Sequence, residues 1–178
     1  EVEAYRFPGD TSNHARFGRT DRNAPMWGPP GHAYVYLVYG MHLMLNLVTD
    51  RVGEPAAVLV RACEVLEGMP IVRARRGDKD GPVLLTGPGK VAAALGLDRS
   101  HSGATLFRRG GLALWDAPQV KDVLVGPRVG IDYAEPVHRD APWRLAIAGT
   151  PWVSQRKTLT PLVGSVPAFL KAQRLTSR

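Results

Sequence analysis

Residues 33–49 carry the pattern that most restricts how this chain can fold. Strand-forming residues run from Tyr34 to Val38, Gly40 supplies a turn, and strand-forming residues resume immediately afterwards. In the returning arm, side chains alternate between the two faces of the strand, and the apolar face is formed by Leu43, Leu45 and Leu47. This pattern predicts a β-hairpin with one face in the core and the other free for function.

Frequent glycine and proline residues divide the rest of the chain into short elements. Helices are expected at Lys90–Leu95, with Pro88 near its first turn and Gly96 after its last, and at Val166–Leu175. Further strands are expected at Val2–Tyr5, Ala56–Cys63, Leu112–Trp115, Arg128–Tyr133 and Trp143–Ala148.

The strands are not regularly separated by crossover helices, which favours the α+β class. We expect a single domain over residues 1–178, with a mainly antiparallel curved β-sheet, a protruding β-hairpin and surrounding short helices.

The charge of the chain favours a polyanionic partner. Its net charge is +7, and arginine supplies 18 of the 23 cationic residues. The planar guanidinium group suits phosphate oxygens, so nucleic acid is the favoured partner, with solubility alone as the alternative explanation. A membrane partner is not expected, because no apolar run reaches spanning length and no basic amphipathic helix stands out.

Cysteine and histidine usage argues against a metal site. A single cysteine, Cys63, excludes an intramolecular disulfide and a multi-cysteine site, and none of the five histidines forms an HxH or HExxH motif. We therefore expect no metal and no cofactor. Residues 1–10 lack the order of a secretory signal, so we expect a reducing compartment: the bacterial cytoplasm, close to the nucleoid, or the nucleus of a eukaryote.

Glu3 and Tyr5 share one face of the first predicted strand. A carboxylate beside an apolar wall has a raised pKa and can act as a base toward water near neutral pH. A solvated glutamate at the edge of a sheet is the alternative, and the pair taken alone favours it.

The predicted hairpin contains three tyrosines. Tyr34 and Tyr36 share a face, and Tyr39 lies at the turn, where its ring stands exposed. Nucleic-acid bases stack on such rings, and an inserted side chain can hold open the gap left by an extruded nucleotide. Aromatic packing on the sheet is the alternative, favoured for Tyr34 and weakest for Tyr39.

Other polar residues need partners or ligands. Asn46 interrupts an apolar strand, so its amide must be paired or face a cavity, where it can read the edge of a base. Arg61 must pair with a carboxylate such as Glu3 or bind an anion. Lys90, beside a predicted helix N-terminus, is expected to contact a DNA phosphate, and a Schiff-base role that would give a lyase is the alternative.

Together these residues resemble the alkyladenine DNA glycosylases, also called 3-methyladenine or methylpurine DNA glycosylases, of the mammalian type. The resemblance covers almost the whole chain and includes EVEAY at its start. The other specific stretches are Arg19–His42, Leu59–Met69, Leu85–Lys90 and Gly149–Ser154.

The resemblance implies a catalytic pair and a base-binding pocket. It implies that Glu3 is the general base that deprotonates the attacking water and that Arg61 helps to hold this water. It further implies that Tyr5, His14 and Tyr36 line the pocket and stack on the flipped base.

The resemblance also implies contacts that govern entry of the base. Tyr39 would insert into the duplex where the base had been, and Asn46 would exclude guanine by a clash with its exocyclic amino group. Arg19 and Lys90 are expected to contact the DNA backbone.

The resemblance thus implies a monofunctional DNA glycosylase, acting as a monomer on double-stranded DNA in base excision repair. Its expected lesions are 3-methyladenine, 7-methylguanine, hypoxanthine and ethenoadenine. A non-catalytic nucleic-acid-binding module and a bifunctional lyase using Lys90 are the alternatives.

The chain departs from the expected motifs at two positions. Val2 stands where we expect threonine, and His42 stands where many relatives have an aromatic residue, which leaves the range of lesions open. Because the first motif begins at residue 1, we also expect an upstream segment in the longer protein.

Overall fold

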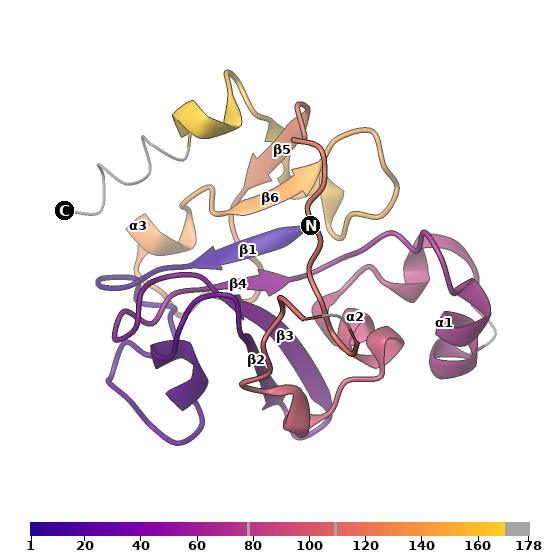
Figure 1. The fold of residues 1–178 in the computed structure, drawn as a ribbon. Coiled ribbons are helices and arrows are strands. Elements are labelled where there is room, and N and C mark those ends of the chain that lie inside the picture. Colours follow the sequence, from indigo (N-terminus) through magenta and orange to yellow (C-terminus); the bar gives the residue numbers. More distant parts are fainter. Residues whose placement is uncertain (78, 109, 170–178) are drawn as a thin grey trace.

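The computed structural model describes residues 1–77, 79–108 and 110–169. Within these ranges seven strands form one antiparallel sheet in the order β2-β3-β4-β1-β6-β5-β7, which curves through the molecule (Figure 1). The α+β prediction is therefore confirmed. The strands are β1 (Val2–Tyr5), β2 (Ala33–Val38), β3 (His42–Val48), β4 (Ala57–Val60), β5 (Val123–Gly126), β6 (Arg144–Ile147) and β7 (Thr160–Pro161).

The predicted hairpin is formed by β2 and β3, with Tyr36 opposite Met44. Its turn places both Tyr39 (φ 52°) and Gly40 (φ 70°) in the left-handed region. Glycine adopts this conformation without strain, whereas a tyrosine does so only where the surrounding turn requires it. The hairpin therefore presents Tyr39 at its tip, 88% exposed.

β1 is the central strand of the sheet and pairs with β4 on one side and β6 on the other. Glu3 lies opposite Leu59 in β4 and Arg144 in β6, so neighbouring strands cover it on both sides. Because of this position, its side chain is fully buried rather than solvated at an edge.

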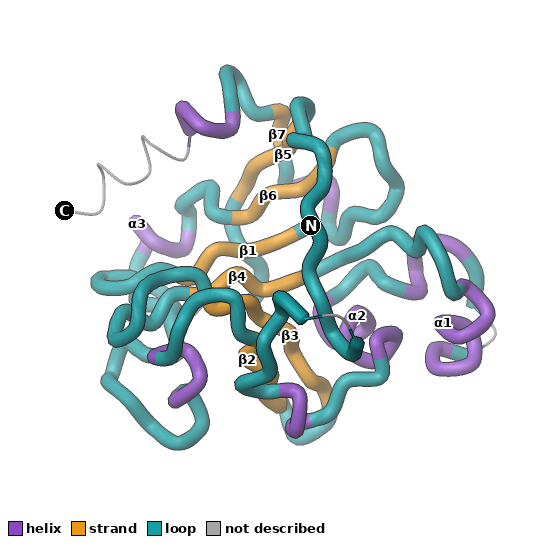
Figure 2. The backbone as a smooth tube through the Cα atoms, viewed as in Figure 1, coloured by secondary structure: helices purple, strands orange, loops and turns teal. Residues whose placement is uncertain are grey.

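Short helices lie around the sheet (Figure 2), and α2 (Pro88–Leu95) packs against β3. Ala92 joins Val35 and Leu45 in a buried apolar cluster, and Gly96 ends the helix with φ 68°. The helix predicted there is thus confirmed. The other helical elements are α1 (Met69–Arg76), α3 (Pro136–Arg139) and the 3-10 turns Ala24–Trp27, Gly81–Leu84, Arg99–His101 and Arg156–Thr158.

Two predicted strands are wrong. Leu112–Trp115 is a loop, in which Leu112 packs against an apolar cluster without joining the sheet. Arg128–Tyr133 consists of bends and turns, because Gly130 adopts φ 75° and the Val129 N–H donates to a side chain rather than to a neighbouring strand.

The C-terminal part of the chain differs from the predictions at β5. β5 was not predicted, although its apolar residues pair with both β6 and β7 in the sheet. The predicted C-terminal helix is present over residues 166–169, and its remainder lies outside the described residues. No helix in the described part of the chain is long and apolar enough to span a membrane.

Candidate active site

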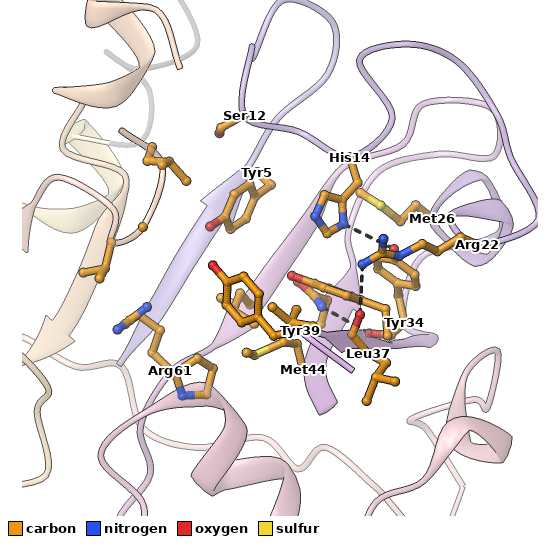
Figure 3. A pocket seen from close by; sticks show the side chains of 18 of the residues that line it. Tyr5, Ser12, His14, Arg22, Met26, Tyr34, Leu37, Tyr39, Met44 and Arg61 are labelled. Carbon is orange, nitrogen blue, oxygen red and sulfur yellow. Dashed lines mark hydrogen bonds between the residues drawn. The ribbon is translucent and has the colours of Figure 1, made fainter. Parts of the chain in front are cut away.

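A pocket of about 640 Å³ opens beside β1 and the β2–β3 hairpin. Tyr5 and Arg61 lie on one side of it, and His14 and Arg22 lie on the other (Figure 3). Other residues that line the pocket are Ser12, Tyr34, Tyr36, Tyr39, Asn46, Val129 and Tyr133.

Glu3 lies behind the pocket wall and receives hydrogen bonds on both carboxylate oxygens. The Tyr5 hydroxyl donates to Oε2 at 3.0 Å, and the Val129 N–H donates to Oε1 at 2.8 Å. Arg61 Nη1 lies 3.2 Å from Oε1. The predicted pairing of Glu3 with Tyr5 and Arg61 is therefore present, and Val129 adds a donor that the sequence did not predict.

These contacts have opposing effects on the Glu3 carboxyl group. Burial raises its pKa, whereas the charge of Arg61 and the hydrogen bonds from Val129 and Tyr5 favour the carboxylate; the pKa lies above its ordinary value. Such a group is a stronger base than a solvated glutamate and still has donors that stabilise its ionised form.

Arg61 lies between two buried carboxylates. Its Nε is 3.3 Å from Glu1 Oε1, and its Nη1 faces Glu3. Glu1 also accepts hydrogen bonds from the Ser154 N–H at 2.6 Å and from Arg144 Nη1 at 3.2 Å. The guanidinium group is therefore held by Glu1 at Nε and by Glu3 at Nη1, and the Arg61 side chain also lines the pocket.

The opposite wall is aromatic. The rings of Tyr34 and Tyr36 stack with centroids 5.0 Å apart, and the His14 ring meets Tyr36 edge-on at 4.5 Å. His14 Nδ1 lies 3.3 Å from the Tyr34 hydroxyl. This arrangement offers flat faces and edges to a planar ring. Tyr34, for which core packing was favoured, lines the pocket as well as packing in the core.

His14 is neutral at physiological pH. Although the residue is exposed overall, desolvation by the surrounding protein and the nearby Arg22 and Arg16 lower its pKa to about 4. The imidazole of His14 therefore carries no positive charge near pH 7.

Asn46 and Tyr39 also line the pocket, at different depths. Asn46 is 4% exposed and donates from Nδ2 to the Tyr34 carbonyl at 3.2 Å, which fixes the orientation of its amide. Tyr39 stands at the rim on the hairpin tip.

Arg19 and Lys90 do not line this pocket. Arg19 lies on the exposed loop before Ala24–Trp27. Lys90 lines a neighbouring groove of about 510 Å³ between β3 and α2, together with His42. Lys90 is thus not among the residues that line the pocket beside Glu3.

Several residues of the site were missed by sequence reasoning. Glu1 has a usable signal, because its spacing places it on the same strand face as Glu3. Val129 acts through its backbone N–H group, for which a sequence pattern gives no signal, whereas Ser154 donates to Glu1 through both its N–H and its hydroxyl. Arg144 lies within the strand predicted at Trp143–Ala148, but only the three-dimensional fold brings it to Glu1.

No group of three or more histidine, cysteine or acidic side chains is arranged for a metal ion among residues that the structure describes. The site thus consists of a buried, hydrogen-bonded carboxylate beside a guanidinium group and an aromatic pocket. This arrangement is suited to activating a water molecule beside a bound planar ring.

Comparison with known proteins identifies the family. The family described as "Methylpurine-DNA glycosylase (MPG)" matches residues 1–151. The chain is 58% identical over 161 residues to a Nitrosococcus oceani protein named "Putative 3-methyladenine DNA glycosylase", covering 90% of this chain and 80% of that protein. It is also 58% identical over 165 residues to the DNA-3-methyladenine glycosylase of Arabidopsis thaliana, covering 91% of this chain and 65% of the plant protein.

The chain belongs to the methylpurine-DNA glycosylase family. The predicted class of enzyme, a DNA glycosylase that hydrolyses an N-glycosyl bond, is thereby confirmed, as is its role in DNA repair.

Proposed function

We propose that this protein is a monofunctional glycosylase that takes a damaged purine out of duplex DNA and hydrolyses its N-glycosidic bond with a water activated by Glu3. The observation that carries the proposal is the placement of Glu3. Its carboxylate is buried, has a raised pKa, and is held by Tyr5 and Val129 beside a pocket large enough for a purine. Arg61 is the residue that would help to hold the water.

The aromatic wall supports a planar base as the ligand. A purine can stack on the pocket tyrosines, and cationic lesions such as 3-methyladenine and 7-methylguanine are attracted to electron-rich ring faces. A neutral His14 does not repel such bases. Hypoxanthine and ethenoadenine lack the positive charge, so their release needs hydrogen bonding and protonation of the leaving base. Asn46 is proposed to exclude guanine through its fixed amide.

The position of Lys90 favours the monofunctional reaction over the lyase. A Schiff base needs the amine at the sugar carbon that loses the base, but Lys90 lines the neighbouring groove rather than the pocket. Its proposed role, like that of Arg19, remains contact with the DNA backbone. The non-catalytic binding module does not agree with the family, whose relatives are named as DNA glycosylases.

A panel of duplexes tests the proposed function. Each duplex carries one 3-methyladenine, 7-methylguanine, hypoxanthine or ethenoadenine residue, and released base is measured by chromatography. We expect release of at least one lesion, no release of guanine, and no covalent protein–DNA adduct when borohydride is added. If none of the lesions is released, the proposed substrate class is wrong, and a trapped adduct would favour the lyase.

Tyr39 is proposed to occupy the gap that the extruded base leaves. Tyr39→Ala removes an 88% exposed ring from the hairpin tip without changing the residues around Glu3. Because holding a base out of the stack costs a few kcal/mol, we expect base release from duplex DNA to fall by roughly 10- to 100-fold. Release from single-stranded DNA should change little, since no gap needs to be filled.

Leu66→Ala is the matched control for Tyr39→Ala, because Leu66 is 87% exposed and does not line the pocket. If Tyr39→Ala lowers base release equally from single-stranded and duplex DNA, the side chain does not act by inserting into the duplex.

A further inference from the structure

Behind Tyr5, the guanidinium group of Arg128 lies between two aromatic rings. Its Cζ is 4.7 Å from the centroid of Tyr5 and 4.8 Å from that of Trp143. Tyr5 lines the pocket, whereas Arg128 does not. The ring that faces a bound base is thus supported from behind by a buried cation.

Asp10 fixes Arg128 in this position. Arg128 Nη1 donates to Asp10 Oδ2 at 2.6 Å, and Nη2 donates to Oδ1 at 3.0 Å, with both side chains fully buried. Burial alone raises the pKa of Asp10, but the hydrogen bonds and charge of Arg128 and the Ser12 donors outweigh this effect, so its pKa is lowered. Asp10 therefore stays ionised, and the two-pronged contact fixes both the position and the plane of the guanidinium group.

The pair joins the segments that form the site. Arg128 Nη1 also donates to the Ala4 carbonyl at 2.8 Å, next to Tyr5 in β1. Asp10 Oδ1 accepts hydrogen bonds from the Ser12 N–H at 3.0 Å and the Ser12 hydroxyl at 2.7 Å, and Ser12 lies at the edge of the pocket above Tyr5 (Figure 3).

Arg128 also precedes Val129, whose N–H holds Glu3 Oε1. One ion pair thus fixes the segments that supply both uncharged donors to the Glu3 carboxylate, the Tyr5 hydroxyl and the Val129 N–H.

We propose that Asp10 and Arg128 are positioning residues for the reaction: without lining the pocket, they set the two hydrogen bonds that orient Glu3 and keep it ionised. The inference rests on the proposed role of Glu3 as the base. A misplacement of about 1 Å in a catalytic group can lower a rate by about 100-fold, so an indirect support of this kind has a large kinetic effect.

Asp10→Asn removes one charge of the pair with little change in shape. We expect base release in single turnovers to fall roughly 10- to 100-fold while affinity for lesion DNA stays within about threefold of the parent protein. Because the donors that favour the Glu3 carboxylate are displaced, the acid limb of the pH–rate profile should move to higher pH. Arg128→Lys keeps the charge but loses the two-pronged contact, so we expect a smaller shift in the same direction.

Asp140→Asn is the matched control, because Asp140 accepts two hydrogen bonds from Arg139 in an exposed pair. It should leave both rate and pH profile unchanged. A merely structural role for Asp10 predicts a lower melting temperature with an unmoved acid limb, and that result would overturn the proposal. Should Asp10→Asn fail to fold, Arg128→Lys supplies the same comparison.

A measurement that needs no activity separates this inference from the proposed function. The pKa of Glu3 is followed by ¹³C NMR of its side-chain carboxyl in the parent protein, Asp10→Asn, Arg128→Lys and Asp140→Asn. We expect the Glu3 pKa to increase in Asp10→Asn and Arg128→Lys but not in Asp140→Asn. If the parent releases no damaged base but the Glu3 pKa shifts as expected, the proposed function fails and the positioning role stands. An unshifted pKa in both variants would refute the positioning role.

Discussion

Replacing Glu3 with glutamine is expected to lower base release by roughly 100- to 10,000-fold, the range over which a positioned general base accelerates proton transfer. Glutamine has nearly the size of glutamate but cannot take a proton from water near neutral pH. The pocket walls contributed by Tyr5, Tyr36 and His14 remain, so the variant should bind lesion duplexes within a few-fold of the parent. The measurement is single-turnover release of the base at saturating enzyme, with affinity determined separately.

The pH dependence of the same reaction tests the chemistry. In the parent protein the rate should rise with pH until Glu3 is deprotonated, and burial places this rise above the range of an ordinary glutamate. In the Glu3→Gln variant, the residual rate should not show this rise with pH. Glu67→Gln makes the same change at an exposed position and should behave as the parent does. Undiminished release by Glu3→Gln would contradict the proposed mechanism.

The hairpin could be predicted because its signal is local. Alternation from Leu43 to Leu47 has the period of a strand, and Gly40 marks its turn, so neighbouring residues alone determine the structure. The same period placed Glu3 and Tyr5 on one face of β1, and their hydrogen bond follows from that geometry.

The burial of Glu3 could not be predicted from the residues beside it. It depends on β1 being the central strand, flanked by β4 and β6, which lie more than 50 and 140 residues further along the chain. The Val129 donor likewise comes from a segment 126 residues away from Glu3. Only the chain-wide resemblance favoured Glu3 over a solvated edge residue, because it reflects the whole fold.

The wrong strands show the same limit. Leu112–Trp115 has apolar residues suited to a strand, but strand propensity depends on a partner, and none of the described strands pairs with this segment. In Arg128–Tyr133, hydrogen bonds to the site replace those of a strand. The Arg128 side chain donates to Asp10, and the Val129 N–H donates to Glu3. Prediction from local sequence patterns thus failed where backbone groups form hydrogen bonds with residues of the site.

Removing the charge of Arg61 should have the second-largest effect, on stability as well as on activity. Arg61→Met leaves the fully buried Glu3 carboxylate without its nearest cation, whereas Glu1 keeps Arg144. Breaking a buried ion pair in this way costs about 3–5 kcal/mol in free energy of unfolding. Base release should fall along with stability, because the pKa of Glu3 rises further and less of it is ionised near pH 7.

The stability loss should depend on pH with a definite sign. In Arg61→Met the Glu3 pKa of the folded state lies further above that of the unfolded state, so folding is penalised most when the pH exceeds the folded value. As the pH falls toward the unfolded value, Glu3 takes up a proton and the deficit relative to the parent shrinks. Urea unfolding at several pH values measures this directly, and a deficit that grows on acidification would contradict the assignment.

A double variant isolates the origin of the loss. Glu3→Gln in the Arg61→Met background removes the charge left without its partner, so the double variant should be more stable at neutral pH than Arg61→Met alone. Arg139→Met is the control, because Arg139 pairs with Asp140 at the exposed surface, where loss of an ion pair changes stability little. If the double variant is no more stable than Arg61→Met, the loss comes from packing of the arginine stem rather than from the buried charge of Glu3.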